Sequence, residues 1–332
     1  MPESLTGARD VLSPAVLSEC VRAATAAPSL HNSQPWRFRL RDGGVDVYAD
    51  QRRRLDVLDP AGRELLISVG AALFTLRLAI RREGFLPGVA LFPDAGDADL
   101  VARVTVGRPE PVTPAVEALA ASIAHRHTNR RPFARSMVPA DVLEHLRDAA
   151  RREGAVLTVA DAPARDAIVR LSRAADRRLR ARGGYRAEMS RWTAPGTGRR
   201  DGVPSSAVGP WDALETVPIR DFGLLRPLPP EPGGFEPYPT IMVLGTEGDG
   251  RAEWVTAGQA LQRVLLAATW QNLATTPISQ PVEIPAVRRL LTATAGGTWA
   301  QMVIRVGYGR PAAATPRRPL SQVLLLPGPD PR

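Results

Sequence analysis

The chain repeats itself, and this constrains its fold more than any other feature. The segment LLISVGAALFTLRLAI at 65–80 overlays WVTAGQALQRVLLAATW at 254–270, with Gly70 on Gly258. Two shorter overlays follow the same order: VLSECVRAA at 16–24 on VLEHLRDAA at 142–150, and VARVTVG at 101–107 on QMVIRVG at 301–307. The offset grows along the chain. This pattern predicts two diverged copies of one α+β unit, with insertions accumulated in the second.

The overlays divide the chain near Thr113, into copy one at 1–112 and copy two at 113–332. Thr113 and Pro114 can cap and start the first helix of copy two. In copy one, the patterns predict helices at 14–26 and 62–83 and strands at 36–40, 45–49 and 101–107. In copy two, they predict helices from 114, at 139–152, 163–181 and 252–273, and strands at 155–160, 240–246 and 301–307.

An insertion at about 182–238 separates the predicted helix at 163–181 from the strand at 240–246. It is rich in Gly, Pro and Arg, so we expect it to stay outside the core. A connection of this length with little regular structure is usually a lid or binding loop, or else a surface excursion. Both interpretations stay open for this insertion.

The chain's composition is that of a folded globular protein, with 44% hydrophobic and 23% charged residues. A net charge of +9 raises nucleic acid or an acidic membrane as partners, but all 43 basic residues are arginine, which suggests GC-rich coding as one source of the charge. The single cysteine, Cys20, can form no internal disulfide and fits a buried structural thiol. No signal pattern or membrane-length apolar run is visible, so we expect a cytoplasmic protein without a membrane partner.

Two arginine clusters are candidates for anion binding. RHTNRR lies at 126–131 and PRRP at 316–319, and arginine forks bind phosphate oxygens through paired hydrogen bonds. Together they could hold a dianion. The alternatives are a solvated basic surface, or an arginine arm in the minor groove of DNA.

Several other chemistries lack their motifs. The sequence has no G-x-S-x-G elbow, no H-E-x-x-H and no histidine pair with zinc-helix spacing backed by carboxylates. VGYGRP lacks the third glycine and following helix of a dinucleotide fingerprint. Nucleic-acid modules are also missing, and aromatic residues make up only 5% of the chain, so we do not expect a nucleic-acid partner.

The stretch PSLHNSQPW at 28–36 resembles the P-S-x-x-N-S-Q-P-W loop of the nitroreductase superfamily, whose members use flavin mononucleotide (FMN). RHTNR resembles that family's R-[RH]-[ST]-x-[RK] phosphate motif, and PRR its C-terminal phosphate arginines. AGQALQRVLLAA and TTPISQPVE add to the likeness, which covers most of the chain outside 182–238. The likeness is greatest to the branch with two repeats in one chain, called the Acg family.

The order of the motifs implies how such a chain builds its site. Ordinary members carry the arginine motif before the P-S-x-x-N loop and form homodimers, in which each flavin lies between protomers. Here the loop comes in copy one and the arginines come in copy two. The resemblance therefore implies a nitroreductase-like intramolecular pseudo-dimer with one complete FMN site, acting as a monomer.

The resemblance also implies roles for individual residues. The pyrimidine side of the flavin ring would meet Pro28, Ser29, Leu30 and Asn32. The phosphate would be held by Arg126, His127, Thr128, Arg130, Arg317 and Arg318. Gln34 and Trp36 would lock the loop and start the next strand, and His31 has no assigned role. Ser279 and Gln280 stand where the family usually has Glu-Gly, and a backbone N–H there would bond flavin N5.

The implied activity is hydride transfer from NAD(P)H, through flavin N5, to a small nitroaromatic, quinone or enone-like acceptor. No catalytic side chain is expected, because the flavin supplies the chemistry. A flavin-storage protein is the alternative, in which Tyr185, Trp192, Trp211 and Phe235 of the insertion close over the ring. An arginine-rich nucleic-acid binder is the third interpretation.

Overall fold

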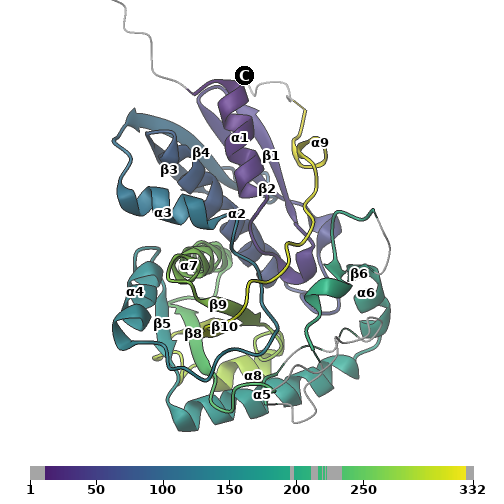
Figure 1. Cartoon of the computed structure of the whole chain (residues 1–332). Helices are drawn as coiled ribbons and strands as arrows, with labels where there is room; N and C mark the ends of the chain where they lie inside the picture. Colours follow the sequence, from purple (N-terminus) through teal and green to yellow (C-terminus); the bar gives the residue numbers. More distant parts are fainter. Residues whose placement is uncertain are drawn as a thin grey trace, which may run out of the picture.

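The structure is a computed structural model, and it describes residues 12–194, 198–210, 216–218, 220, 222 and 234–326. Two four-stranded sheets lie on either side of a central pair of long helices, α2 and α7 (Figure 1). Copy one comprises α1 (Pro14–Ala24), β1 (Trp36–Arg41), β2 (Gly44–Ala49), α2 (Arg63–Arg82), β3 (Phe85–Leu91) and β4 (Leu100–Pro109). Helix α2 packs on the first sheet, and α7 packs on the second.

Copy two is longer, and its elements are, in order, α3 (Pro114–Ser122), α4 (Ala140–Arg151), β5 (Val156–Val159), α5 (Ala162–Arg180), α6 (Tyr185–Trp192), β6 (Thr193–Ala194), β7 (Val203–Pro204), β8 (Thr240–Thr246), α7 (Arg251–Trp270), β9 (Ala274–Ile278), α8 (Pro285–Leu290), β10 (Trp299–Gly307) and α9 (Leu320–Val323). No helix in the described ranges has the length and apolar composition needed to cross a membrane.

The strand order confirms the duplication. The first sheet runs β1-β2-β4-β3 and the second β5-β8-β10-β9, so both place their first, second, fourth and third strands side by side, and all these pairs are antiparallel. The overlaid strands β4 and β10 occupy the same inner position. The overlaid helices α1 and α4 pack on α2 and α7 respectively. The predicted α+β fold with two repeats is therefore confirmed, while the boundary at Thr113 stays a prediction.

Helices α2 and α7 cross at the two glycines that the sequence overlay aligned. A Cβ on Gly70 would lie 2.2 Å from the Val255 carbonyl oxygen, and one on Gly258 would lie 2.0 Å from the Ile67 oxygen. In each case the glycine contacts the residue three positions before the other glycine, as in a two-fold symmetric interface. The absence of side chains at this point lets the two copies pack closely.

Two strands and part of the insertion differ from expectation. Strands β3 and β9 were not predicted, because Pro87 and Pro277 interrupt their patterns and both lie at sheet edges, where proline is tolerated. The expectation that 182–238 stays outside the core is wrong for α6, because Tyr185, Met189 and Trp192 are buried in an apolar cluster with α5 and α8 residues. The Gly, Pro and Arg content hid this short amphipathic helix.

The C-terminal tail returns from copy two to copy one. After β10 it crosses the molecule and reaches the outer edge of β1, where the Leu325 amide donates to the Phe38 carbonyl at 2.7 Å (Figure 1, yellow). The tail thereby carries Arg317 and Arg318 past the 28–36 loop.

Candidate functional site

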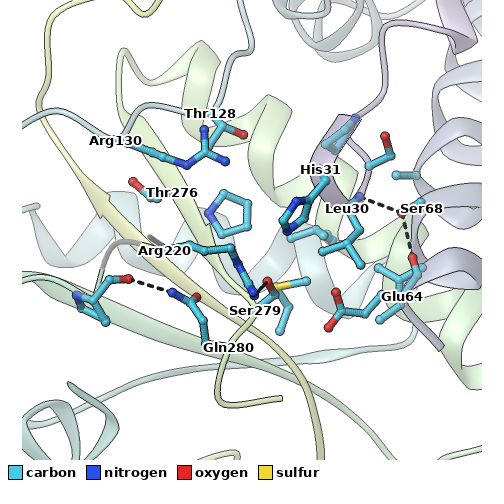
Figure 2. A pocket seen from close by; sticks show the side chains of 18 of the residues that line it. Leu30, His31, Glu64, Ser68, Thr128, Arg130, Arg220, Thr276, Ser279 and Gln280 are labelled. Atoms are coloured by element: carbon cyan, nitrogen blue, oxygen red, sulfur yellow. Dashed lines mark hydrogen bonds between the residues drawn. The ribbon is translucent and has the colours of Figure 1, made fainter. Parts of the chain in front are cut away.

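A cavity with about 790 Å³ of empty volume lies where the two copies meet, and it is partly open to solvent. Copy one contributes the 28–31 segment and one face of α2, and copy two contributes residues near 128–130 and 276–280, together with Pro218, Arg220 and Phe222 (Figure 2). Its lining residues are Pro28, Ser29, Leu30, His31, Glu64, Ile67, Ser68, Ala71, Thr128, Arg130, Pro218, Arg220, Phe222, Leu261, Thr276, Pro277, Ser279, Gln280 and Met302. Predicted site residues that lie far apart in the sequence thus line the same cavity.

The 28–36 loop holds an uncommon backbone. His31, Asn32 and Gln34 have φ angles of 50°, 54° and 51°, a region that non-glycine residues adopt at a cost of about 1–3 kcal/mol each. Internal hydrogen bonds fix the turn: the Gln34 amide donates to Ser29 Oγ at 2.9 Å, and the Leu30 amide donates to Ser68 Oγ of α2 at 3.2 Å. The loop is therefore held in one shape, with Leu30 and His31 at the cavity.

Gln34 and Trp36 have the structural roles expected of them. Gln34 is fully buried, donates to the Arg200 carbonyl at 2.8 Å and accepts from the Arg318 amide at 2.8 Å. Trp36 is also fully buried and begins β1. These contacts tie the loop to both the insertion and the C-terminal tail.

Asn32 does not line the cavity. Its side-chain nitrogen donates to the carbonyls of Gly202 (3.0 Å) and Pro316 (3.1 Å), and its oxygen accepts from Arg317 Nη1 at 3.0 Å. The amide thus joins the loop to the tail. The sequence motif alone did not predict that the Asn32 side chain connects the loop to the tail.

His31, at the position with no predicted role, is buried in the cavity wall. Its ring meets Phe222 edge-on at 5.6 Å, and the Arg130 guanidinium lies 5.0 Å from the centre of the same Phe222 ring. Burial, and then the charges of Arg220 and Arg130, lower the pKa of His31 well below its usual value. The imidazole is therefore neutral at neutral pH.

Arg126, His127 and Arg317 form a group that we call the cation cradle. Arg126 and Arg317 both donate to the Ala26 carbonyl, at 3.3 and 3.1 Å. Arg126 Nε, His127 Nδ1 and Arg317 Nε are buried without hydrogen-bond partners, and no described carboxylate pairs with either arginine. Two guanidinium groups and an imidazole nitrogen therefore gather with no carboxylate partner among the described residues.

Burial is the main cause of the pKa shifts of both arginines in the cation cradle. Burial, and then the charge of Arg317, lower the pKa of Arg126 to about 9, and burial lowers the pKa of Arg317 to about 10. Both groups stay cationic at neutral pH. A second hollow, of about 680 Å³, is lined by Arg317 together with Arg22, Arg200 and Arg318. The positive potential thus extends to the surface beside the cradle.

The other predicted phosphate residues point elsewhere. Thr128 and Arg130 line the cavity itself, where Arg130 donates to the Ala207 carbonyl at 2.7 Å (Figure 2). Arg318 donates to the carbonyls of Gln34 and Gln322 and ties the loop to the tail. Within the described residues, the cluster thus divides into a cradle, a cavity wall and a tether.

Ser279 and Gln280 lie at the cavity, and the insertion holds both. Arg220 donates to Ser279 Oγ at 3.2 Å and forms an ion pair with Glu283, and Gln280 Nε2 lies 3.5 Å from the Pro218 carbonyl. Both residues follow β9 (Figure 2).

Among the lining residues that the sequence did not single out are Glu64, Ser68, Arg220 and Phe222. An acidic residue inside the apolar pattern of α2 was the one signal available for Glu64. The aromatic residues expected to cover a ligand also differ, because the lining includes Phe222 but not Tyr185, Trp192 or Phe235. Trp211 falls outside the described residues.

Known proteins resemble the chain over most of its length. A model of the nitroreductase family matches residues 230–308. The Mycobacterium tuberculosis protein named "Putative NAD(P)H nitroreductase Rv3131" is 35% identical over 318 residues, which are 92% of this chain and 89% of that protein. "Putative NAD(P)H nitroreductase acg" from the same organism is 32% identical over 93% of this chain and 95% of that protein.

A crystal structure from Anabaena variabilis, titled as a putative nitroreductase, aligns at 11% identity with a TM-score of 0.49, over 89% of this chain and 88% of its own. The sequence relatives decide the assignment, since their identity exceeds 30% over nearly the whole chain. The expected resemblance to the Acg-type proteins is confirmed, and the chain belongs to the nitroreductase family.

Proposed function

We propose that the chain binds one FMN between its two copies and works as an NAD(P)H-dependent oxidoreductase. The observation that carries this proposal is the cation cradle. Its buried donors lack a carboxylate partner among the described residues, and they belong to segments that continue into the cavity lining at Pro28 and Thr128. Relatives with NAD(P)H nitroreductase in their names support the activity. The acceptor we expect is a small nitroaromatic, quinone or enone-like molecule.

The cation cradle fits the phosphate end of FMN. Burying an arginine without a counter-charge is costly, and a bound dianion would offset this cost and restore the pKa values of both guanidinium groups. Arg126 and Arg317 offer forked donors, which match phosphate geometry. His127 adds a ring nitrogen at the same place, in the role the motif predicts.

The cavity would then take the ring. Pro28, Ser29 and Leu30 line it from copy one, and Ser279 and Gln280 line it from copy two. Thr128 and Arg130 also face the cavity, so we assign them to the ring side and not to the phosphate. Arg318 and Asn32 are assigned to holding the loop and tail, because their polar groups bond other parts of the chain.

Bound FMN would supply hydride transfer, the chemistry that such cofactors perform. The chain's own contribution is to orient the reacting molecules and to limit water. Phe222 and the neutral His31 form an uncharged section of the cavity wall, next to Arg130. Orienting the reacting molecules and limiting water require no nucleophile among the described lining residues.

The chain should hold one flavin and act as a monomer. The 28–36 loop comes from copy one and the cradle's Arg126 from copy two, so a second copy of the chain is not required. In copy two, the chain passes from α4 directly to β5, and no counterpart of the loop is present there. A cytoplasmic location remains a prediction from the sequence.

Storage of flavin without turnover is the second candidate. It is favoured by the wall that the insertion forms at Pro218, Arg220 and Phe222, since this wall covers the same cavity that an acceptor must enter. Both candidates require bound FMN. They differ in whether bound flavin reacts with a nicotinamide and an acceptor.

Two measurements test the proposal. The absorbance spectrum of the purified protein, with the cofactor released and counted, should give one FMN per chain. A colourless protein that cannot be loaded would refute flavin binding, and steeply salt-dependent DNA binding would then favour the nucleic-acid interpretation. Anaerobic mixing of the loaded protein with NADH or NADPH should bleach the flavin band. If neither nicotinamide bleaches the band, flavin storage without turnover is the remaining candidate.

A further inference from the structure

Glu64 is a buried carboxyl at the second residue of α2, and it lines the cavity. The residue is 3% exposed. Its Oε1 accepts from Arg63 Nη2 at 2.8 Å, whereas its Oε2 is buried without any partner. Figure 2 shows Glu64 on the α2 side of the cavity, with Arg220 and Ser279 facing it. The roles proposed above for the flavin site do not use this carboxyl.

Glu64 belongs to a cluster of charged groups, most of them buried. The cluster's cations are Arg63, Arg220 and Arg288, and its carboxyls are Asp59, Glu64, Asp249 and Glu283. Glu64 shares its one direct cation, Arg63, and a second carboxylate, Glu283, acts on it, so its charged form is costly to bury.

The contacts indicate which carboxyl is least stabilised in its charged form. Glu283 pairs directly with Arg220, and Asp249 pairs with Arg288. Asp59 accepts the Leu65 amide at 2.8 Å. Glu64 shares Arg63, because the other guanidinium nitrogen of Arg63 donates to Gln301 at 2.8 and 3.1 Å.

The charged groups that act on Glu64 are Glu283, Arg63, Asp59 and Arg220, and the nearby His31 is neutral. Burial, and then the negative charge of Glu283, raise the pKa of Glu64 well above its usual value. A proton on Glu64 would lie on Oε2, because Oε1 accepts from Arg63. Oε2 has no hydrogen-bond partner among the described residues and lines the cavity, so this proton would be available to a ligand there.

We propose that Glu64 donates a hydrogen bond to an oxygen of the hydride acceptor and supplies the proton that accompanies the hydride, which favours quinone-type acceptors. This inference rests on the proposed flavin function. The quinone gains a hydride from the reduced cofactor and a proton from Glu64, so one O–H bond breaks at Glu64 and one forms on the hydroquinone. Arg63 and Arg220 stabilise the carboxylate, which then takes a proton from water through the open side of the cavity.

The test compares two oxidants of the reduced, FMN-loaded protein in anaerobic stopped flow. p-Benzoquinone takes up a hydride and a proton, whereas ferricyanide takes electrons singly and no proton. Glu64→Gln keeps a hydrogen-bond donor but cannot release a proton. We expect it to slow the quinone step by at least about 100-fold, the usual lower bound for a positioned proton donor, and to leave the ferricyanide step unchanged.

The solvent deuterium isotope effect on the quinone step should be lost in this variant. The matched control is Glu188→Gln, because the pKa of Glu188 is also raised by burial but its carboxylate accepts the amides of Val57 and Leu58 and does not line the cavity. This control should behave as wild type with both oxidants. Equal slowing of both oxidants by Glu64→Gln would overturn the proposal.

Infrared spectroscopy gives a readout that does not depend on turnover. At neutral pH the wild-type protein should show a carboxylic acid band that shifts in heavy water, disappears in Glu64→Gln and persists in Glu188→Gln. A wild-type spectrum without such a band would overturn the proposal. The band can be measured without flavin, so failure to bind FMN would refute the proposed function and still leave Glu64 tested.

If Glu64→Gln does not fold, Glu64→Asp tests proton delivery from this position. Aspartate keeps an acidic proton on a chain that is one methylene shorter. The isotope effect on the quinone step should then persist at a reduced rate. Its absence in a folded, loaded Glu64→Asp protein would count against proton delivery from this position.

Discussion

Replacing Gly258 by alanine should separate the two central helices and destabilise the fold. The new Cβ would lie 2.0 Å from the Ile67 carbonyl oxygen, 2.8 Å from its carbonyl carbon and 2.9 Å from Gly70 Cα. Side-chain rotation cannot relieve these contacts, since all three atoms are backbone. Restoring a Cβ contact of 3.0 Å, the shortest that real proteins show, requires the helices to move apart by 1.0 Å at this point.

We expect Gly258→Ala to lower the free energy of unfolding by about 3 kcal/mol, the upper end of the range for overpacking a core. Urea unfolding of the flavin-free protein, followed by tryptophan fluorescence, measures this change. Gly70→Ala should cost a similar amount, because its Cβ would lie 2.2 Å from the Val255 oxygen. FMN affinity should fall as well, since α2 and α7 both contribute residues to the cavity.

Gly183→Ala is the matched control. A Cβ at Gly183 meets nothing within 4 Å, and its φ is not positive. This substitution should be neutral or should stabilise the protein by about 0.4–1 kcal/mol, through the unfolded chain. If Gly258→Ala unfolds at the same urea concentration as Gly183→Ala, the close helix crossing does not exist as described.

Three further predictions concern the site. Arg126→Met should weaken FMN binding by about 3 kcal/mol, roughly 100-fold, but leave riboflavin binding unchanged in titration calorimetry. The control, Arg318→Met, should affect FMN and riboflavin binding equally. If Arg126→Met weakens the binding of both ligands equally, the cradle does not hold the phosphate. Burial raises the pKa of Asp59 from 3.8 to about 6, so the native state binds this proton more tightly than the unfolded chain does. The free energy of unfolding should therefore fall as pH rises through that window. Asp59→Asn should remove this part of the fall, and the same stability profile in wild type and variant from pH 4 to 7 would refute the assignment. Phe222→Ala should speed FMN release, measured by the recovery of flavin fluorescence on dilution, because it removes the wall between His31 and Arg130; an unchanged rate would show that Phe222 does not retain the ligand.

Much of the fold could be predicted because the core elements carry strong periodic patterns. Helices α2 and α7 were located to within about three residues, the usual uncertainty of element ends. The exceptions were short or interrupted. Prolines concealed the edge strands β3 and β9, and α6 lay inside a segment whose overall composition suggested surface. Its buried Tyr185 and Trp192 depend on partners from α5 and α8, which no local pattern reveals.

The candidate site was predicted less completely than the fold. The motifs named the loop and the arginines, but could not separate residues that face the cavity from those that tie segments together. Asn32 and Arg318 became tethers because the C-terminal tail passes beside the 28–36 loop. Glu64, Arg220 and Phe222 were missed, since each belongs to an ordinary local sequence and acquires its place only when the two copies pack.

The sequence by itself determined the duplication, the two glycines that align in its longest overlay, and the unequal sharing of the two binding motifs between the copies. These are local patterns and internal likenesses, which need no coordinates. Only the tertiary structure decided that Arg126 and Arg317 share one carbonyl, and that neither they nor the cavity-facing oxygen of Glu64 has the expected partner among the described residues. Burial and charge balance depend on which distant segments meet, and that is a property of the packed chain.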